Sequence, residues 1–325
     1  MTINRRNLLQ ATAAFGAAAL VGLPPLTARA RTTDTVRLGW GRGGLPLIAK
    51  QRGEFAKELA AKDIKVEWVG PFPNHAPSLQ AVVGGSADFG FWGSTTPALA
   101  AILAGSPLVF TQFNVYKPRS TAIIVKKDSG IDSVADLRGK SIAVNRSGLG
   151  EFLLIAALEK HGLGRNDVTV VYLNPPDAAP AFGQGKVDAW SMWTPAVDIA
   201  REQFDAKDIF FEGTDLDFLI DYSSLVTTRD FATENADLLR ATIEAYRNEG
   251  KWISEHPTEA ETIAQAEGQY SDAVRDHLIG YHRQNLFYQA DDAEFLAQFQ
   301  RAADWLSDRQ ILPGRITVAD HVVRG

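Results

Sequence analysis

Two stretches of the chain follow one pattern: Gly85-Ser86-Ala87-Asp88-Phe89-Gly90-Phe91-Trp92-Gly93-Ser94-Thr95-Thr96-Pro97-Ala98 and Gly185-Lys186-Val187-Asp188-Ala189-Trp190-Ser191-Met192-Trp193-Thr194-Pro195-Ala196. Each begins with a glycine turn and an aspartate, runs through a short aromatic segment typical of a strand, and ends on Pro-Ala, which opens a helix. Two such strand-to-helix junctions predict two similar α/β lobes that hold a ligand between helix N-termini. The Asp-to-Pro spacing differs by two residues, so a chance similarity is the alternative.

The rest of the chain alternates in the same way. Apolar periodicity predicts strands at 36–40, 64–69, 87–91, 108–113, 121–125, 141–144, 168–173, 187–192 and 209–211. It predicts intervening helices at 45–50, 78–83, 97–103, 151–161, 180–182 and 196–204, and C-terminal helices at 236–255, 258–267, 271–284 and 291–308. Alternation of this kind favours an α/β fold in which each lobe is a mostly parallel sheet flanked by helices.

The chain is expected to pass between the lobes twice, near 116–118 and near 221–222. Lobe 1 would comprise residues 31–117 and 222–325, with the C-terminal helices on lobe 1 or bracing both lobes, and lobe 2 residues 118–221. Two crossings make a hinge, and hinged lobes can close on a ligand.

The N-terminus reads as an export signal. Arg5-Arg6 precedes an apolar run from Ala11 to Leu23, and Ala28-Arg29-Ala30 has the small residues of a cleavage site. The adjacent arginines favour a twin-arginine signal over residues 1–30, with a general secretory signal as the alternative. The apolar run is too short to span a membrane, and we expect a soluble, monomeric periplasmic protein.

Composition excludes several classes of function. Removal of residues 1–30 takes away three arginines and no acidic residue, so the formal charge of −6 becomes −9. No basic stripe for nucleic acid is evident, and the absence of cysteine excludes thiolate catalysis. The six histidines have no metal-ligand spacing, and no Gly-x-Ser-x-Gly motif occurs. We therefore expect no enzymatic activity, metal or cofactor.

Four groups of residues resemble a known family: Gly39-Trp40-Gly41-Arg42-Gly43; Asp88-Phe89-Gly90 with Gly93-Ser94-Thr95-Thr96-Pro97; Val134-Ala135-Asp136-Leu137-Arg138-Gly139-Lys140; and Val187-Asp188-Ala189-Trp190 with Trp193-Thr194-Pro195. Residues 34–232 resemble the periplasmic solute-binding proteins of ABC importers, in the branch that binds aliphatic sulfonates, taurine and nitrate. The resemblance implies a two-lobed, type II periplasmic-binding-protein fold without catalysis and a membrane permease as partner. Some relatives carry Asp in place of Ser94 and Thr194, and Glu151 stands at a position that is neutral or basic in relatives, so the ligand is open.

The first two cleft loops of the resemblance offer donors for an anion. Loop one is Trp40, Arg42 and Gly43, where a guanidinium and a helix N-terminus would meet the ligand. The alternative is a flexible turn with a solvated Arg42. Loop two is Trp92, Gly93, Ser94 and Thr95, where at least one hydroxyl is expected to face the ligand, although hydroxyl residues before a proline are also ordinary helix caps.

The other two cleft loops lie in the second half of the pattern. Loop three is Arg146, Ser147, Gly148 and Glu151; Glu151 either binds a ligand amine or complements the dipole in the first turn of a helix, and Arg146 pairs with Glu151 or with the ligand. Loop four is Trp193 and Thr194, with Trp190 expected in the core. Tyr222 at the second crossing would add an aromatic surface, although buried aromatics belong more often to the core.

The sequence thus predicts a periplasmic binding protein that captures a small organosulfonate, such as an aliphatic sulfonate, taurine or a sulfate ester. One alternative is a binder of an uncharged or cationic heteroaromatic compound, favoured by the tryptophans and Glu151. Another is an enzyme on the same fold; the thiamine-pyrimidine synthases are related, but their motif is rich in cysteine.

Overall fold

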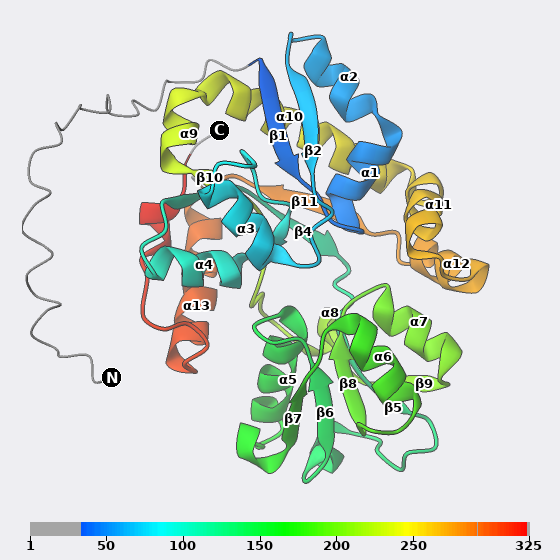
Figure 1. Cartoon of the computed structure of the whole chain (residues 1–325). Coiled ribbons are helices and arrows are strands. Elements are labelled where there is room, and N and C mark those ends of the chain that lie inside the picture. The colour runs from blue at the N-terminus through cyan, green and yellow to red at the C-terminus, as the bar shows by residue number, and fades with distance from the viewer. Residues whose placement is uncertain (1–33, 291, 324–325) are drawn as a thin grey trace, which may run out of the picture. The chain divides into compact units, whose positions relative to one another are not determined.

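The computed structural model describes residues 34–290 and 292–323. The predicted signal peptide at residues 1–30 lies outside the described residues. Three sheets and their helices form two lobes (Figure 1).

Lobe 1 carries a two-stranded and a four-stranded sheet. The first pairs β1 (Thr35–Gly39) with β2 (Lys65–Val69), and the second has the order β11-β4-β10-β3. Its other strands are β3 (Gly93–Ser94), β4 (Leu108–Lys117), β10 (Ser223–Thr228) and β11 (Gln284–Tyr288). Its helices are α1 (Gly44–Arg52), α2 (Glu54–Ala60), α3 (His75–Val83), α4 (Thr95–Leu103), α9 (Arg229–Glu234), α10 (Ala236–Glu255), α11 (Pro257–Gly268), α12 (Asp272–Gly280) and α13 (Ala293–Asp308), with a 3-10 turn at Val318–His321.

Lobe 2 is built on one five-stranded sheet of order β7-β6-β8-β5-β9. The strands are β5 (Ala122–Lys126), β6 (Ser141–Val144), β7 (Thr169–Tyr172), β8 (Ala189–Met192) and β9 (Ala206–Phe211). The helices are α5 (Leu149–Lys160), α6 (Pro175–Gly183), α7 (Ala196–Gln203) and α8 (Glu212–Asp215), with 3-10 turns at Val134–Leu137 and Arg165–Asp167.

The two-lobed α/β class is confirmed, but the sheets are mixed rather than mostly parallel. Parallel pairing joins β1 to β2 and β6 to both β7 and β8, as the βαβ pattern predicts. Strand β10 instead runs antiparallel to β4, and β5 runs antiparallel to β8 and β9. The reason is the double crossing, because the outgoing and returning segments run in opposite directions where they lie together.

Two predicted elements differ in the structure. The expected strand at 87–91 is reduced to a single parallel bridge between Leu38 and Phe89. The helix expected at 271–284 ends at Gly280, and the chain continues into β11, which pairs antiparallel with β4. Gly280 is a helix-terminating residue, and the extended state of β11 beyond it is stabilised by pairing with a strand far away in the sequence.

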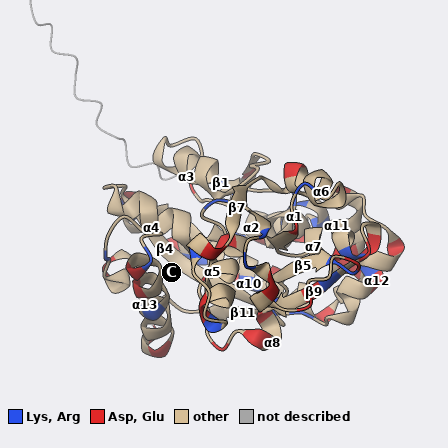
Figure 2. Cartoon of the chain, turned by 90° about the horizontal axis from the view of Figure 1, so that it is seen from below, with Lys and Arg blue, Asp and Glu red and all other residues tan. Residues whose placement is uncertain are grey.

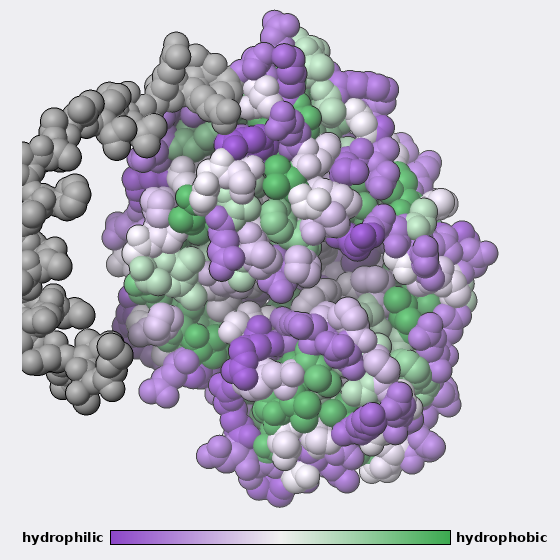
Figure 3. Space-filling model, viewed as in Figure 1, coloured by the Kyte–Doolittle hydropathy of each residue, from purple (hydrophilic) through white to green (hydrophobic). Residues whose placement is uncertain are grey.

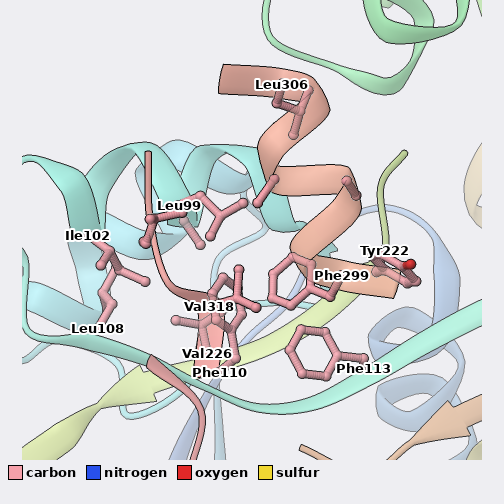
Figure 4. Close-up of a cluster of buried hydrophobic side chains, with 14 of the residues drawn as sticks. Leu99, Ile102, Leu108, Phe110, Phe113, Tyr222, Val226, Phe299, Leu306 and Val318 are labelled. Carbon is pink, nitrogen blue, oxygen red and sulfur yellow. The ribbon is translucent and has the colours of Figure 1, made fainter. Parts of the chain in front are cut away.

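A large apolar cluster joins α4, β4 and α13 in lobe 1. Figure 4 shows Phe110, Phe113 and Phe299 packed together, with Tyr222 at the edge of the cluster. Aromatic rings dominate the contact, for example Phe113 and Phe299 with ring centroids 5.0 Å apart. Burial of such rings is the main stabilising contribution to a core of this kind.

The C-terminal helices contact both lobes. Helix α12 packs against α7, where Ile199 lies beside the apolar cluster of Tyr270, Val274 and Leu278. Beyond the end of α13, Arg309 donates two hydrogen bonds to the carboxylate of Glu159 on α5, at 2.8 and 2.6 Å. The C-terminal segment thus contacts α7 and α5, which carry residues assigned to lobe 2. No helix among the described residues has the length and apolar composition needed to cross a membrane.

Candidate ligand-binding site

Loop one follows β1 and leads into α1. Trp40 is buried, with the Nζ atom of Lys50 4.4 Å from the centre of its ring. Arg42 is largely exposed and forms an ion pair with Glu267 at the end of α11. Gly43 is the N-cap of α1, which lacks a side-chain cap, so backbone N–H groups of its first turn remain without intrahelical partners.

Loop two is held rigidly against the returning chain. The Thr95 hydroxyl and backbone N–H donate to Asp221 Oδ1 at 2.6 and 2.9 Å, and the same N–H also donates to the Tyr222 carbonyl at 3.0 Å. Burial raises the pKa of the Asp221 carboxyl, opposed by the hydrogen bonds of Ser94 and Thr95 and by the charge of Arg119. Thr95 is thus a structural anchor of loop two, and its hydroxyl is already used.

The backbone of loop two has no room for a side chain at Gly93. A Cβ atom on Gly93 would lie 2.2 Å from Cγ of the buried His75 ring. The Gly93 carbonyl accepts a hydrogen bond of 3.0 Å from the Ser224 hydroxyl on β10. Gly93 therefore lets the chain pass between α3 and β10.

Loop three is organised around the carboxylate of Glu151, which is only 5% exposed. It accepts hydrogen bonds from the Ser147 backbone N–H at 2.7 Å, the Arg165 guanidinium at 2.6 Å and the Tyr172 hydroxyl at 2.7 Å. This geometry fits the helix-capping interpretation, since the carboxylate is fully used within lobe 2. Arg165, and not Arg146, is its cationic partner.

Arg146 and Ser147 of loop three are exposed to solvent, whereas Gly148 is buried. The guanidinium of Arg146 stacks on the Tyr172 ring, with its central carbon 3.6 Å from the ring centre. Ser147 is exposed and has a φ of 54°, and Gly148 is the N-cap of α5 without a side-chain cap. Arg146 and the uncapped first turn of α5 are the anion-binding groups that this loop offers.

The end of β8, just before loop four, lies directly beside the start of α5. The Ser191 hydroxyl donates to the Gly150 carbonyl at 2.7 Å, and a Cβ atom on Gly150 would lie 2.2 Å from the Ser191 carbonyl oxygen. Trp190 is 1% exposed, as expected of a core residue, whereas Trp193 and Thr194 are half-buried. The Thr194 Oγ1 atom is buried without a hydrogen-bond partner among the described residues.

Two aromatic residues expected at the site lie in the core. Trp92 packs edge-to-face on Tyr246 and Phe287, with ring centroids 5.4 and 5.7 Å apart. Tyr222 is 2% exposed, and its ring contacts Phe295 and Phe299. Its hydroxyl has no partner among the described residues, and burial raises its pKa. The rings are therefore structural, and only their polar atoms, Trp92 Nε1 and the Tyr222 hydroxyl, remain unpaired.

The two crossings are joined by charged groups that sequence reasoning missed. Arg119 forms an ion pair with the 1%-exposed side chain of Glu212 and donates to the Asp221 carbonyl at 3.2 Å. These partners are about a hundred residues apart, so nothing local in the sequence signals the network. His75, which lies beneath loop two, was also missed, because its partner Ser94 is 19 residues away on another element.

The surface is hollowed between the two lobes, as Figure 3 shows. Hydrogen bonds join loop two to the returning crossing at Asp221, and join the end of β8, just before loop four, to the first turn of α5. Elsewhere basic and acidic residues lie close together, as around α12 and α13 in Figure 2. Arg275 pairs with Asp272 on α12, and Arg315, beyond the end of α13, pairs with Asp304 on that helix. In the part of the chain that the structure describes, no group of three or more His, Cys, Asp or Glu side chains could hold a metal ion.

Residues 46–260 match the NMT1/THI5-like protein family. An Escherichia coli (strain K12) protein, provisionally named an aliphatic sulfonates-binding protein, is 27% identical over 89% of this chain and 88% of its own length. The taurine-binding periplasmic protein of the same organism is 30% identical over 61% of this chain and 57% of its own length.

Solved structures of sulfonate-binding proteins are similar to this chain over most of its length. The periplasmic aliphatic sulphonate binding protein SsuA from Escherichia coli is 25% identical, with a TM-score of 0.80 over 90% of this chain and 92% of that one. The alkanesulfonate-binding protein SsuA from Xanthomonas axonopodis pv. citri, bound to MOPS, is 26% identical, with a TM-score of 0.79 over 90% and 99%. The desulfurization enzyme DSZB, 16% identical at a TM-score of 0.66 over 90% and 97%, shares the fold alone. The chain therefore belongs to the NMT1/THI5-like family and has the two-lobed fold of the periplasmic aliphatic sulfonate-binding proteins.

Proposed function

We propose that this protein is the periplasmic solute-binding component of an ABC importer and captures a small organosulfonate between its lobes. The observation that carries the proposal is the match to the MOPS-bound SsuA over 90% of this chain and 99% of that one. Lobe 1 would comprise residues 31–117 and 222–325, and lobe 2 residues 118–221. The protein would act as a monomer that delivers its ligand to a membrane permease.

The helix N-termini support binding of an oxyanion. The helices that begin at the four cleft loops, α1, α4, α5 and α7, lack a side-chain cap. At α4 the Thr95 N–H already donates to the Asp221 carboxylate, and at α7 the Val197 N–H donates to the Trp193 carbonyl. The first-turn N–H groups and dipoles of α1 and α5 are therefore the ones proposed to favour a negative group such as a sulfonate. Arg42 and Arg146 are the proposed cations; Arg42 would exchange its exposed ion pair with Glu267 for the ligand.

The proposed neutral contacts are the unpaired polar atoms of the site. Thr194 Oγ1 and the Tyr222 hydroxyl are buried without partners among the described residues. Such atoms lose the hydration that they would have in water, and a ligand oxygen that accepts from them would restore a hydrogen bond. Trp193 is the proposed apolar surface for the organic tail.

The alternative that the protein binds a cationic ligand depended mainly on the carboxylate of Glu151. Glu151 already accepts three hydrogen bonds within lobe 2, so no free carboxylate remains there for an amine. We further propose that the protein binds without turnover, because the relatives that match most of the chain are sulfonate-binding proteins. Export would use the twin-arginine signal at residues 1–30.

Isothermal titration calorimetry tests the ligand class. Butanesulfonate and MOPS are compared with pentanoate, which has a similar tail and a carboxylate head group. Sulfonates are expected to bind and to stabilise the protein by RT ln(1 + [L]/Kd), about 2.7 kcal/mol at a hundredfold excess over Kd. Binding of heteroaromatic amines but of no sulfonate would overturn the ligand class.

The same samples test the absence of catalysis. After prolonged incubation, the bound sulfonate is released by denaturation and identified by mass spectrometry. Recovery of the unchanged sulfonate is expected. Release of sulfite, or recovery of a desulfonated product, would show that the protein is an enzyme on this fold.

A further inference from the structure

His75 lies beneath loop two and was not among the residues expected at the site. It is the first residue of α3, it is 4% exposed, and its Nδ1 atom lies 2.7 Å from the Ser94 carbonyl oxygen. A carbonyl oxygen can only accept, so Nδ1 must carry the proton that forms this bond. Burial lowers the pKa of His75 to about 4, so the imidazole is neutral at pH 7 and Nε2 carries no proton.

The Ser94–Thr95 peptide unit is consequently held at both ends. Its carbonyl oxygen accepts from His75, and its N–H donates to Asp221 Oδ1 at 2.9 Å. A peptide unit fixed at both its oxygen and its nitrogen cannot rotate about its flanking bonds without breaking a hydrogen bond to a buried group. The direction of the N-terminus of α4, which begins at Thr95, is thereby set.

The fit around the ring is close. Gly93 lies against the imidazole, where a Cβ atom would be 2.2 Å from Cγ, and the Phe91 ring meets the imidazole edge-on with centroids 5.6 Å apart. The ring is held by these contacts in the orientation that points Nδ1 at Ser94. A side chain of similar volume without a donor would fill the space but leave the Ser94 carbonyl unpaired.

We propose that His75 is a positioning residue for the ligand site: its Nδ1–H group fixes the Ser94 carbonyl and so orients loop two and the start of α4 toward the ligand. The inference rests on the proposed function, because the cleft is where a sulfonate would bind. His75 itself does not contact the ligand and acts through the backbone of loop two.

Two substitutions separate the hydrogen bond from the packing. His75→Asn keeps an N–H donor close to the place of Nδ1, whereas His75→Leu fills much of the same space without a donor. Ser78→Ala is the matched control, because the Ser78 hydroxyl on the same helix accepts from the Phe91 N–H at 2.8 Å and does not touch Ser94 or Thr95.

The first measurement needs no ligand. Hydrogen exchange at the Thr95 amide, followed by NMR on the full mature chain, reports the opening of the peptide unit. His75→Leu is expected to exchange roughly tenfold faster than the wild type, with His75→Asn close to the wild type and Ser78→Ala unchanged at this amide. Unchanged exchange in His75→Leu would overturn the inference.

The second measurement is calorimetry with butanesulfonate on the same proteins. His75→Leu is expected to bind roughly tenfold more weakly, with His75→Asn within about threefold of the wild type. Equal affinity in the wild type and His75→Leu would overturn the positioning role. If the wild type bound no sulfonate while exchange at Thr95 rose only in His75→Leu, the sulfonate proposal would fail and the anchoring of loop two by His75 would stand.

Discussion

Substitution of Glu151 by glutamine separates a structural from a ligand-binding role of this carboxylate. The carboxylate is 5% exposed and accepts from a backbone N–H, a guanidinium and a phenol hydroxyl. The amide of glutamine has one oxygen and one NH₂ group, so at least one of the three donors would face another donor. The change therefore removes a charge and leaves a buried donor without an acceptor.

The expected cost is about 2–3 kcal/mol of unfolding free energy. Hydrogen bonds to a charged group contribute about 1.5–3 kcal/mol each, but the Arg165 partner is 41% exposed, so its share is reduced by solvent screening. Unfolding entropy for a chain of this length is about 0.6 kcal/mol per degree, which converts the cost into a fall in Tm of about 4 °C. Differential scanning calorimetry of the ligand-free protein measures this shift.

Glu159→Gln is the matched control, since Glu159 lies on the same helix and pairs with Arg309 at the surface, where it is 42% exposed. Its loss is expected to cost under about 1 kcal/mol. Sulfonate affinity should change little in Glu151→Gln once folded protein is compared at equal concentration. An unchanged Tm together with a large loss of affinity would refute this reasoning and would place Glu151 on the ligand.

Three further outcomes are expected. The pKa of His75 is about 4 in the folded protein and 6.5 in the unfolded chain, so the unfolded chain binds more protons between these two values. The contribution of neutral His75 to the free energy of unfolding is therefore complete above pH 6.5. This contribution is lost as the pH falls toward 4, which lowers the free energy of unfolding by about 3 kcal/mol. In urea unfolding, the loss of stability between pH 7 and pH 4.5 should thus be smaller in His75→Asn than in the wild type. Equal losses in the two proteins would contradict the lowered pKa of His75. Gly93→Ala should lower the free energy of unfolding by about 1–3 kcal/mol, because the new Cβ atom would collide with His75. Gly43→Ala has open space at its Cβ position and should change the free energy of unfolding by no more than about 0.5 kcal/mol. Equal unfolding midpoints of the two variants in urea would argue against the collision. Changing Arg5 and Arg6 together to Lys should stop export, seen as cytoplasmic accumulation of the precursor by cell fractionation; normal periplasmic recovery would favour the general secretory route.

The amphipathic and locally bounded elements could be predicted from the sequence. Helix α10 spans 236–255 and strand β6 spans 141–144, both as predicted, because their apolar periodicity and flanking residues are local signals. Strand β11 was missed because the expected helix was continued past Gly280, where α12 ends, and because the pairing of residues 284–288 with β4 is distant in the sequence. Local propensity is overridden where a distant strand supplies the hydrogen bonds.

The loops that form the candidate site could be located, but the partners of their side chains could not. The turn residues and helix starts at Gly93 and Gly148 are readable in the sequence. Glu151 was correctly placed in the first turn of a helix, yet its partners Arg165 and Tyr172 lie 14 and 21 residues away on other elements. Which donors reach a buried carboxylate is decided by tertiary packing, which a single sequence does not encode as a local pattern.

The buried charges at the crossings link loop two mechanically to the hinge. Asp221 belongs to the returning crossing and accepts from Thr95 at the start of α4, while Arg119 of the outgoing crossing donates to the Asp221 carbonyl and pairs with Glu212. Removing one partner of such a pair leaves an uncompensated buried charge, which typically costs about 3–5 kcal/mol. A substitution at Asp221 or Arg119 would therefore disturb loop two and the two segments that connect the lobes together. Weaker ligand binding in such a variant would therefore report a change in the arrangement of the loops and the lobes, and not the loss of a direct contact with the ligand. Direct contacts with the ligand have to be tested at residues outside this network.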